Sequence, residues 1–157
     1  MAIYYHLSNQ DNLIEVVRET EDLKEGQIIP RIPDQYHGED QTPRVCLSPT
    51  VWQCILSKPL KGDSDVLYIY EIDVKKPTEH KGIIADIEVT DEKWITNEDL
   101  IRIGNPVKLN IIGKLVSNKE VKLRLNRLNK QGKLPKDRSE QEMVWRTENE
   151  KWELMID

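Results

Sequence analysis

Histidine and cysteine are the side chains of this sequence most suited to metal binding or nucleophilic catalysis, and there are five of them: His6, His37, His80, Cys46 and Cys54. Their nitrogen and sulfur atoms are zinc ligands, but their spacing matches no zinc pattern. Cys46 or Cys54 with His6 would also make a nucleophile and its base. We expect neither arrangement, and we expect both cysteines to pack as small hydrophobic groups.

The standard motifs of nucleotide and hydrolase chemistry are absent from the sequence. It contains no G-x-G-x-x-G, P-loop, H-E-x-x-H, C-x-x-C or G-x-S-x-G motif. Two cysteines do not supply a disulfide framework, so we expect a reducing, cytoplasmic compartment. No run approaches the roughly 20 apolar residues of a membrane span, and residues 1–10 lack the basic start of a signal peptide.

The composition predicts one folded domain. Of the 157 residues, 38% are hydrophobic and 32% are charged, which is polar for a globular protein. Val, Ile and Leu nevertheless recur in blocks of strand length, so a disordered, collagen-like or coiled-coil chain is excluded.

The charge is unevenly distributed along the chain. Lys and Arg against Asp and Glu give −8 over residues 1–113, +7 over 114–138 and −4 over 139–157. We call residues 114–138 the basic band. It is either a solvated helix face or a surface that attracts an acidic partner or nucleic acid. Its candidate partner-binding residues are Lys119, Lys122, Lys130, Lys133 and Lys136.

The elements that must position these residues follow from apolar patterning. We expect strands at 2–6, 44–47, 66–74, 83–89 and 107–116, with 66–74 central in a sheet and Gly113 at a bulge. Helices are expected at 13–17, from Pro49 through Leu56, at 96–99 and at 118–128. Residues 143–146 and 151–156 form a hairpin, and 30–43 form a long loop. Because strands and helices do not alternate regularly, the fold class is α+β.

Five short sequence motifs follow one another along the chain in an informative order. They are residues 5–8 (YHLS), 44–50 (RVCLSPT), 67–71 (LYIYE), 86–93 (DIEVTDEK) and 105–115 (NPVKLNIIGKL). Together they resemble the small ADP-ribosyltransferases, most closely the rifamycin-type enzymes. The resemblance implies an ADP-ribosyltransferase-like split β-sandwich of small, mostly antiparallel sheets over residues 1–116. Residues 117–157 then add a basic helix and a hairpin that pack on the same domain.

The resemblance also implies a reaction. NAD is the cofactor, used as a substrate, and its ADP-ribose is transferred to a protein, a nucleic acid or a small molecule. His6 takes the role of holding the ribose by hydrogen bonds, and Asp86 is the catalytic carboxylate that stabilises positive charge at C1′ or takes the acceptor's proton. Ser48 lies near the ribose, and Leu7, Ser8 and Cys46 complete the cofactor site.

Two positions depart from the family pattern. Cys46 replaces a tyrosine that stacks on nicotinamide, and Leu7 replaces a glycine that lets the backbone approach closely. Tyr36, Tyr68 or Trp52 would have to supply the ring instead. Without the resemblance, His6 is a half-buried structural residue and Asp86 guards a strand edge.

Two rival functions remain open. The first is a catalytically degenerate member that binds a nucleotide or a host protein, as small inhibitors from phages or mobile elements do, and Cys46 favours it. The second is RNA 2′-phosphotransfer on the same broad fold. That reaction needs basic residues lining the cleft, whereas the excess of basic over acidic residues lies after residue 113.

Overall fold

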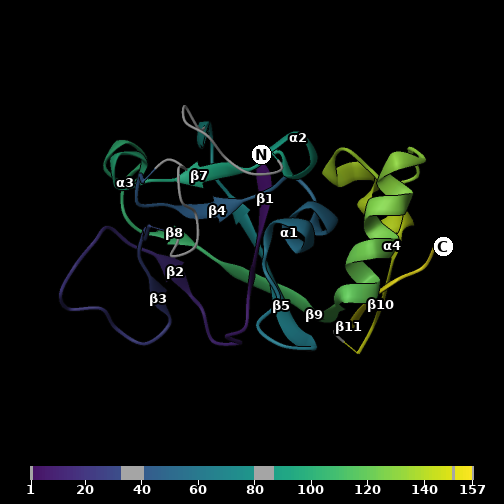
Figure 1. Ribbon diagram of the computed structural model, residues 1–157. Helices are drawn as coiled ribbons and strands as arrows, with labels where there is room; N and C mark the ends of the chain where they lie inside the picture. Colours follow the sequence, from purple (N-terminus) through teal and green to yellow (C-terminus); the bar gives the residue numbers. More distant parts are fainter. Residues whose placement is uncertain (1, 33–40, 80–86, 150, 157) are drawn as a thin grey trace.

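The computed structural model describes residues 2–32, 41–79, 87–149 and 151–156 (Figure 1). These residues form a mixed α+β fold of small sheets and short helices, which confirms the predicted fold class. The largest sheet has the strand order β1-β5-β9-β11-β10. Its strands are β1 (Ile3–Ser8), β5 (Ser64–Asp73), β9 (Asn110–Asn118), β11 (Lys151–Leu154) and β10 (Trp145–Glu148).

Neighbouring strands in this sheet run antiparallel except β9 and β11, which are parallel. The strands predicted at 2–6 and 66–74 and the C-terminal hairpin are confirmed, with small shifts of their ends. The single strand predicted at 107–116 is instead two strands, β8 (Val107–Lys108) and β9, which belong to different sheets. The hairpin joins the sheet that begins with the first strand of the chain, so residues from both halves of the sequence build one layer.

Strand β5 is interior, with β1 on one side and β9 on the other. Leu67 and Ile69 point to one face of the sheet, and Tyr70 and Ile72 point to the opposite face; all four are almost inaccessible to solvent. A strand that is buried on both faces needs a nearly continuous apolar sequence. This requirement explains why residues 66–74 are the most apolar stretch of the chain.

A bulge interrupts the pairing of β5 with β9. Ile69 lies opposite Gly113, but the next residue, Tyr70, lies opposite Ile111, so Ile112 is the extra residue of β9. The bulge predicted at Gly113 is thus confirmed. An inserted residue bends its strand and increases the local twist.

The sheet separates two hydrophobic cores. On one face, helices α1 (Val51–Ser57) and α4 (Lys119–Lys130) pack on the sheet, and the first core forms between them. Helix α1 is the helix predicted after Pro49, and α4 is the predicted basic helix. Leu125 and Leu128 of α4 are buried in this core, while most of the charged residues of the helix face outward.

Two three-stranded sheets cover the opposite face and enclose the second core. In Figure 1 they lie on the side of β1 away from α4. One contains β3 (Gln27–Ile28), β2 (Glu15–Val16) and β8 (Val107–Lys108). The other contains β4 (Val45–Leu47), β7 (Lys93–Ile95) and β6 (Thr78–Glu79), and β4 is the strand predicted at 44–47.

Three short helical segments complete the described chain: α2 (Ile87–Thr90), α3 (Asn97–Ile103) and the 3₁₀ helix η1 (Arg138–Met143). Helix α3 confirms the helical turn predicted at 96–99. The Thr96 hydroxyl accepts from the amide of Asp99, and the Asp99 carboxylate accepts from the amide of Thr96. This reciprocal pair satisfies two amides at the start of the helix.

Two predicted elements are wrong. Residues 13–17 are not a helix, because residues 15–16 form β2, which pairs with β3 and β8 and buries Val16 in the second core. The strand predicted at 83–89 lies partly outside the described residues, and its described end, 87–89, is helical within α2. Both segments carry apolar residues in runs too short to distinguish the two periodicities.

Candidate functional site

His6 lies where β1 meets β4. The amide of Tyr5 donates to the carbonyl of Ser48 at 2.9 Å, and the amide of Ser48 donates to the carbonyl of Tyr5 at 3.1 Å. This bridge joins the largest sheet to a small one and places His6 Nδ1 2.9 Å from the carbonyl oxygen of Cys46.

The contact with Cys46 fixes the tautomer of His6. A carbonyl oxygen only accepts hydrogen bonds, so Nδ1 of the neutral ring carries the hydrogen and Nε2 carries the lone pair. No residue in the described ranges is hydrogen-bonded to Nε2. This nitrogen is thus an acceptor without a partner among these residues.

His6 is neutral at pH 7. Burial lowers its pKa to about 4, the hydrogen bond to the Cys46 carbonyl opposes this, and the positive charge of Lys58 lowers the pKa further. Burial disfavours the charged imidazolium because the ring loses water. A neutral imidazole with a fixed lone pair suits the acceptance of a hydroxyl hydrogen bond.

The two cysteines are not organised as nucleophiles. His6 contacts the backbone of Cys46 rather than its thiol, and burial followed by the nearby Glu92 raises the pKa of that thiol. Burial raises the pKa of Cys54 to about 12, and its Sγ donates to the Tyr5 carbonyl at 3.2 Å. Since the thiolate is the reactive form, neither thiol is activated at neutral pH.

A cluster of charged and aromatic groups adjoins Cys46. Cys46 pairs across strands with Trp94. The Arg44 guanidinium lies 4.2 Å from the centre of the Trp94 ring, and the Trp94 indole donates to Glu92 at 3.1 Å. Arg44 and Glu92 are only 5% and 8% exposed, respectively. Both act on the Cys46 thiol, whose pKa Glu92 raises and Arg44 lowers.

Sequence reasoning did not identify Arg44, Lys58, Glu92 or Trp94 as parts of this site. Arg44 precedes a short apolar strand, and Glu92 lies between the charged residues Asp91 and Lys93, so nothing in the local pattern marks either as buried. Lys58 follows the end of α1, and its pKa is lowered by burial and by Lys61. Lys58 therefore lies close enough to His6 to act on its charge, although the excess of basic over acidic residues lies after residue 113.

The remaining predicted cofactor residues occupy different places. Ser48 is buried at the bridge to β1 and interacts with the Cys54 thiol. Leu7 is buried in the first core, on the face of β1 opposite His6, and the Ser8 hydroxyl accepts from the amide of Gln10 at 3.1 Å. The structure brings His6, Cys46 and Ser48 together, and it turns the side chain of Leu7 away from them.

The catalytic carboxylate predicted at Asp86 lies outside the described residues, as does Tyr36. Trp52 is fully buried and its indole donates to the Pro135 carbonyl at 2.7 Å, so it offers no ring face to a ligand. Tyr68 is half-buried and pairs with Ser8 on the face of the sheet that carries His6. Of the proposed replacement rings, Tyr68 is the one that the described chain places on that face.

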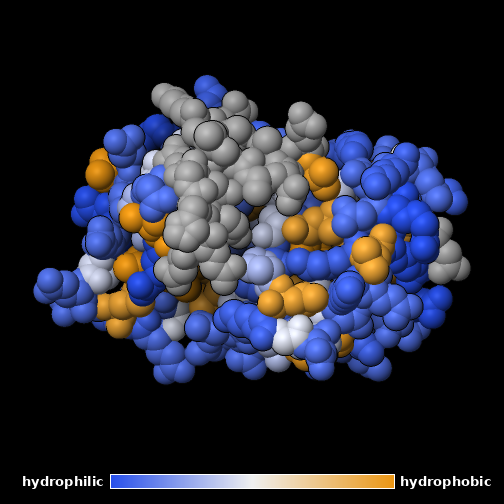
Figure 2. Space-filling view, viewed as in Figure 1, coloured by the Kyte–Doolittle hydropathy of each residue, from blue (hydrophilic) through white to orange (hydrophobic). Residues whose placement is uncertain are grey.

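The lysines of the basic band differ in their contacts. Lys119, Lys130 and Lys133 are exposed. The ammonium of Lys122 donates a hydrogen bond to the Lys58 carbonyl, and burial lowers the pKa of Lys122. Lys136 lies 5.0 Å from the centre of the Trp52 ring and donates to Asn129 at 2.9 Å. Figure 2 shows a largely hydrophilic surface at the end of the molecule where α4 lies.

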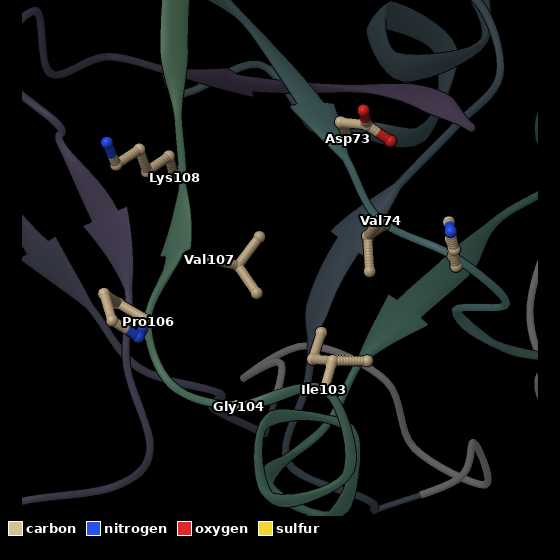
Figure 3. Close-up of a pocket in the computed structure, with 8 residues that line it drawn as sticks. Asp73, Val74, Ile103, Gly104, Pro106, Val107 and Lys108 are labelled. Atoms are coloured by element: carbon tan, nitrogen blue, oxygen red, sulfur yellow. The ribbon is translucent and has the colours of Figure 1, made fainter. Parts of the chain in front are cut away.

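A cavity of about 380 Å³ lies between the end of β5 and β8 (Figure 3). Val74, Ile103 and Val107 point into it, whereas Lys108 extends to the other side of its strand. The carboxylate at its rim, Asp73, accepts from the amide of Ala2 at 3.1 Å. With an apolar interior and an engaged carboxylate, this cavity offers less chemistry than the surroundings of His6.

Within the described ranges, no three His, Cys, Asp or Glu side chains are grouped so as to hold a metal ion. No helix of the described chain is long and apolar enough to cross a membrane. No protein-family model, curated protein or solved structure matches the chain.

Proposed function

We propose that the chain is an NAD-dependent ADP-ribosyltransferase with an ADP-ribosyltransferase-like split β-sandwich, whose NAD site lies at His6. The observation that carries the proposal is the 2.9 Å contact between His6 Nδ1 and the Cys46 carbonyl. It leaves Nε2 as a fixed acceptor for a ribose hydroxyl. The order of sequence motifs that resemble this family supplies the reaction.

In this reaction the bond between ribose C1′ and the nicotinamide nitrogen breaks, and its electron pair leaves with neutral nicotinamide. Positive charge develops at C1′, where a carboxylate stabilises it. The acceptor then attacks C1′ and gives its proton to a base. By resemblance Asp86 supplies the carboxylate, and His6 orients the ribose. Lys58, whose charge reaches His6, supplies positive charge for the diphosphate of NAD.

The acceptor in this proposal is an acidic macromolecule that docks on the basic band. Lys119, Lys130 and Lys133 are its contacts, because their side chains are exposed. Lys122 and Lys136 already have intramolecular partners and contribute mainly to the local field.

A second candidate function is nucleotide binding without turnover. The observation that favours it is the Cys46 thiol at the position of the family's stacking ring, beside a Trp94 ring that Arg44 already covers. Such a protein would bind NAD through His6 or inhibit a host protein, and it would release no nicotinamide.

Nicotinamide release separates the two functions. The protein is incubated with NAD, with and without cell lysate, and free nicotinamide and labelled macromolecules are measured. Asp86→Asn should reduce turnover far more than it weakens NAD binding, because the charge is needed chiefly in the transition state. Asp73→Asn is the matched control. Binding of NAD without nicotinamide release would instead establish the second function.

A further inference from the structure

A separate cavity of about 630 Å³ lies on the face of the large sheet opposite His6. Its floor comes from four neighbouring strands, through Tyr5, Glu71, Ile112 and Trp152. Residues of η1, including Arg138 and Gln141, form the remaining wall. We call it the η1 cavity. Its volume falls within the roughly 300–1,000 Å³ of small-molecule sites.

The charged groups of the η1 cavity balance one another. Arg138 donates from Nε at 3.3 Å and from a terminal nitrogen at 3.0 Å, both to the same oxygen of Glu71. The guanidinium also lies beside the Tyr5 phenol, where it lowers the pKa that burial raises. A free anion would meet the Glu71 carboxylate and a free cation would meet Arg138, so a ligand without net charge fits best.

The rest of the lining combines apolar surface with hydrogen-bonding groups. Ile112 and Trp152 supply apolar area. Arg138 uses two of its five N–H donors on Glu71 and its side chain is 48% exposed, so its remaining donors favour a ligand with acceptors. An aromatic ring in the wall also favours a flat ring system.

From this combination we infer that the η1 cavity binds a neutral, planar heterocycle of the nucleobase kind. Its ring packs on Trp152 and Ile112, and its polar edge meets Arg138, Glu71 and the Tyr5 phenol. This site does not depend on the proposed transferase activity, because it uses none of the side chains around His6.

A ligand in the η1 cavity would also affect the contact between η1 and α1. Gln141 is 2% exposed, accepts a hydrogen bond from the amide of Val51 in the first turn of α1, and contacts the Tyr5 phenol. A ligand on Tyr5 and Gln141 therefore stabilises the contact between η1 and α1.

The test uses adenine as the neutral probe, with benzoate and benzamidine as charged aromatic comparators, by titration calorimetry on the full chain. Adenine should bind more tightly than either charged ring. Ile112→Phe, which fills the cavity, and Arg138→Met should each weaken adenine binding at least tenfold. Ile111→Phe on the same strand and Arg127→Met on α4 are matched controls that should leave it unchanged.

Several results would overturn the inference. They are no adenine binding by the native chain, a preference for either charged ring, or binding that survives both cavity variants. His6→Ala should retain adenine binding, and its loss there would assign the adenine to the His6 site instead. If Ile112→Phe does not fold, as judged by its near-ultraviolet circular dichroism, Arg138→Met alone decides the outcome.

Discussion

His6 and Cys46 lie 40 positions apart in the sequence, and the ring nitrogen Nδ1 of the first lies 2.9 Å from the carbonyl oxygen of the second. The contact ties a strand of the large sheet to a strand of a small one and sets the tautomer of the imidazole, which burial keeps neutral. Because His6 takes part both in folding and in the proposed NAD site, changes at His6 are measurable as changes in stability and in NAD affinity.

Replacing His6 should weaken NAD binding with little loss of stability. His6→Ala removes one acceptor to the ribose, so we expect NAD affinity to fall by about fivefold, the equivalent of roughly 1 kcal/mol. Calorimetric titration with NAD and thermal melting of the same sample measure both effects. A large drop in melting temperature with unchanged NAD affinity would show that His6 is structural only.

The depressed pKa of His6 predicts acid sensitivity. Its pKa is lowered to about 4 in the folded protein, against 6.5 ordinarily, so the unfolded chain binds the proton more tightly. Above pH 6.5 the ring is neutral in both states, so this difference has no effect there, and the free energy of unfolding decreases as the pH falls toward 4. The loss attributable to His6 is on the order of 3 kcal/mol.

Urea unfolding of the native chain and of His6→Asn between pH 4 and 7 measures this loss. Carboxylates titrate in both proteins, so the difference between the two curves isolates His6. We expect the native chain to lose more stability than the variant as the pH falls. Parallel curves would mean that His6 titrates alike in the folded and unfolded chains.

Asp99 should be important for stability. The Thr78 hydroxyl donates to its carboxylate at 2.7 Å, the Thr96 amide at 2.9 Å and Arg102 at 3.1 Å. Burial would raise the pKa of Asp99, but these hydrogen bonds outweigh burial and lower it. Asp99→Asn should cost about 2 kcal/mol in urea unfolding. The exposed neighbour change Glu98→Gln is the control, and equal effects would contradict the prediction.

The basic band should separate docking from catalysis. Charge reversal of Lys119, Lys130 and Lys133 should leave NAD hydrolysis intact and abolish labelling of an acidic acceptor. Labelling by the native chain should also fall steeply as salt rises, since counterions screen or replace charge contacts. If labelling changes neither on charge reversal nor with salt, the basic band is a solvated face and not a docking surface. Residues 30–43, which the sequence predicts to be a loop and of which 33–40 lie outside the described residues, would then become the better candidate for acceptor recognition.

The sequence predicts the longer elements of this fold and misses the two-residue strands β2, β3 and β6. Residues 66–74 are apolar because β5 is buried on both faces, so their pattern is unambiguous. Strands β2, β3, β6 and β8 have only two residues each, too few for any periodicity to be read. Their existence depends on pairing partners far along the chain, which local propensity does not encode.

The candidate site likewise contains residues that the sequence predicts and residues that it misses. His6 stands out because an aromatic strand leads to it. Lys58, Arg44 and Glu92 gain their environment from tertiary packing, and the packing against Trp94 and Cys46 has no local signature. The raised pKa of the Cys46 thiol likewise follows from burial rather than from the residues beside it in sequence.

The hydrogen bond from Val51 to Gln141 forms only after both residues have been synthesised, although they lie 90 positions apart. Ribosomes extend a protein from its N-terminus, so η1 and the β10–β11 hairpin emerge after the other described elements. Until then the start of α1 lacks this partner, and β9 lacks its neighbour β11. Incomplete chains expose apolar surface and unpaired strand edges. A nascent chain halted near residue 136 would therefore be a substrate for chaperones and proteases, although α1 and β9 are already made.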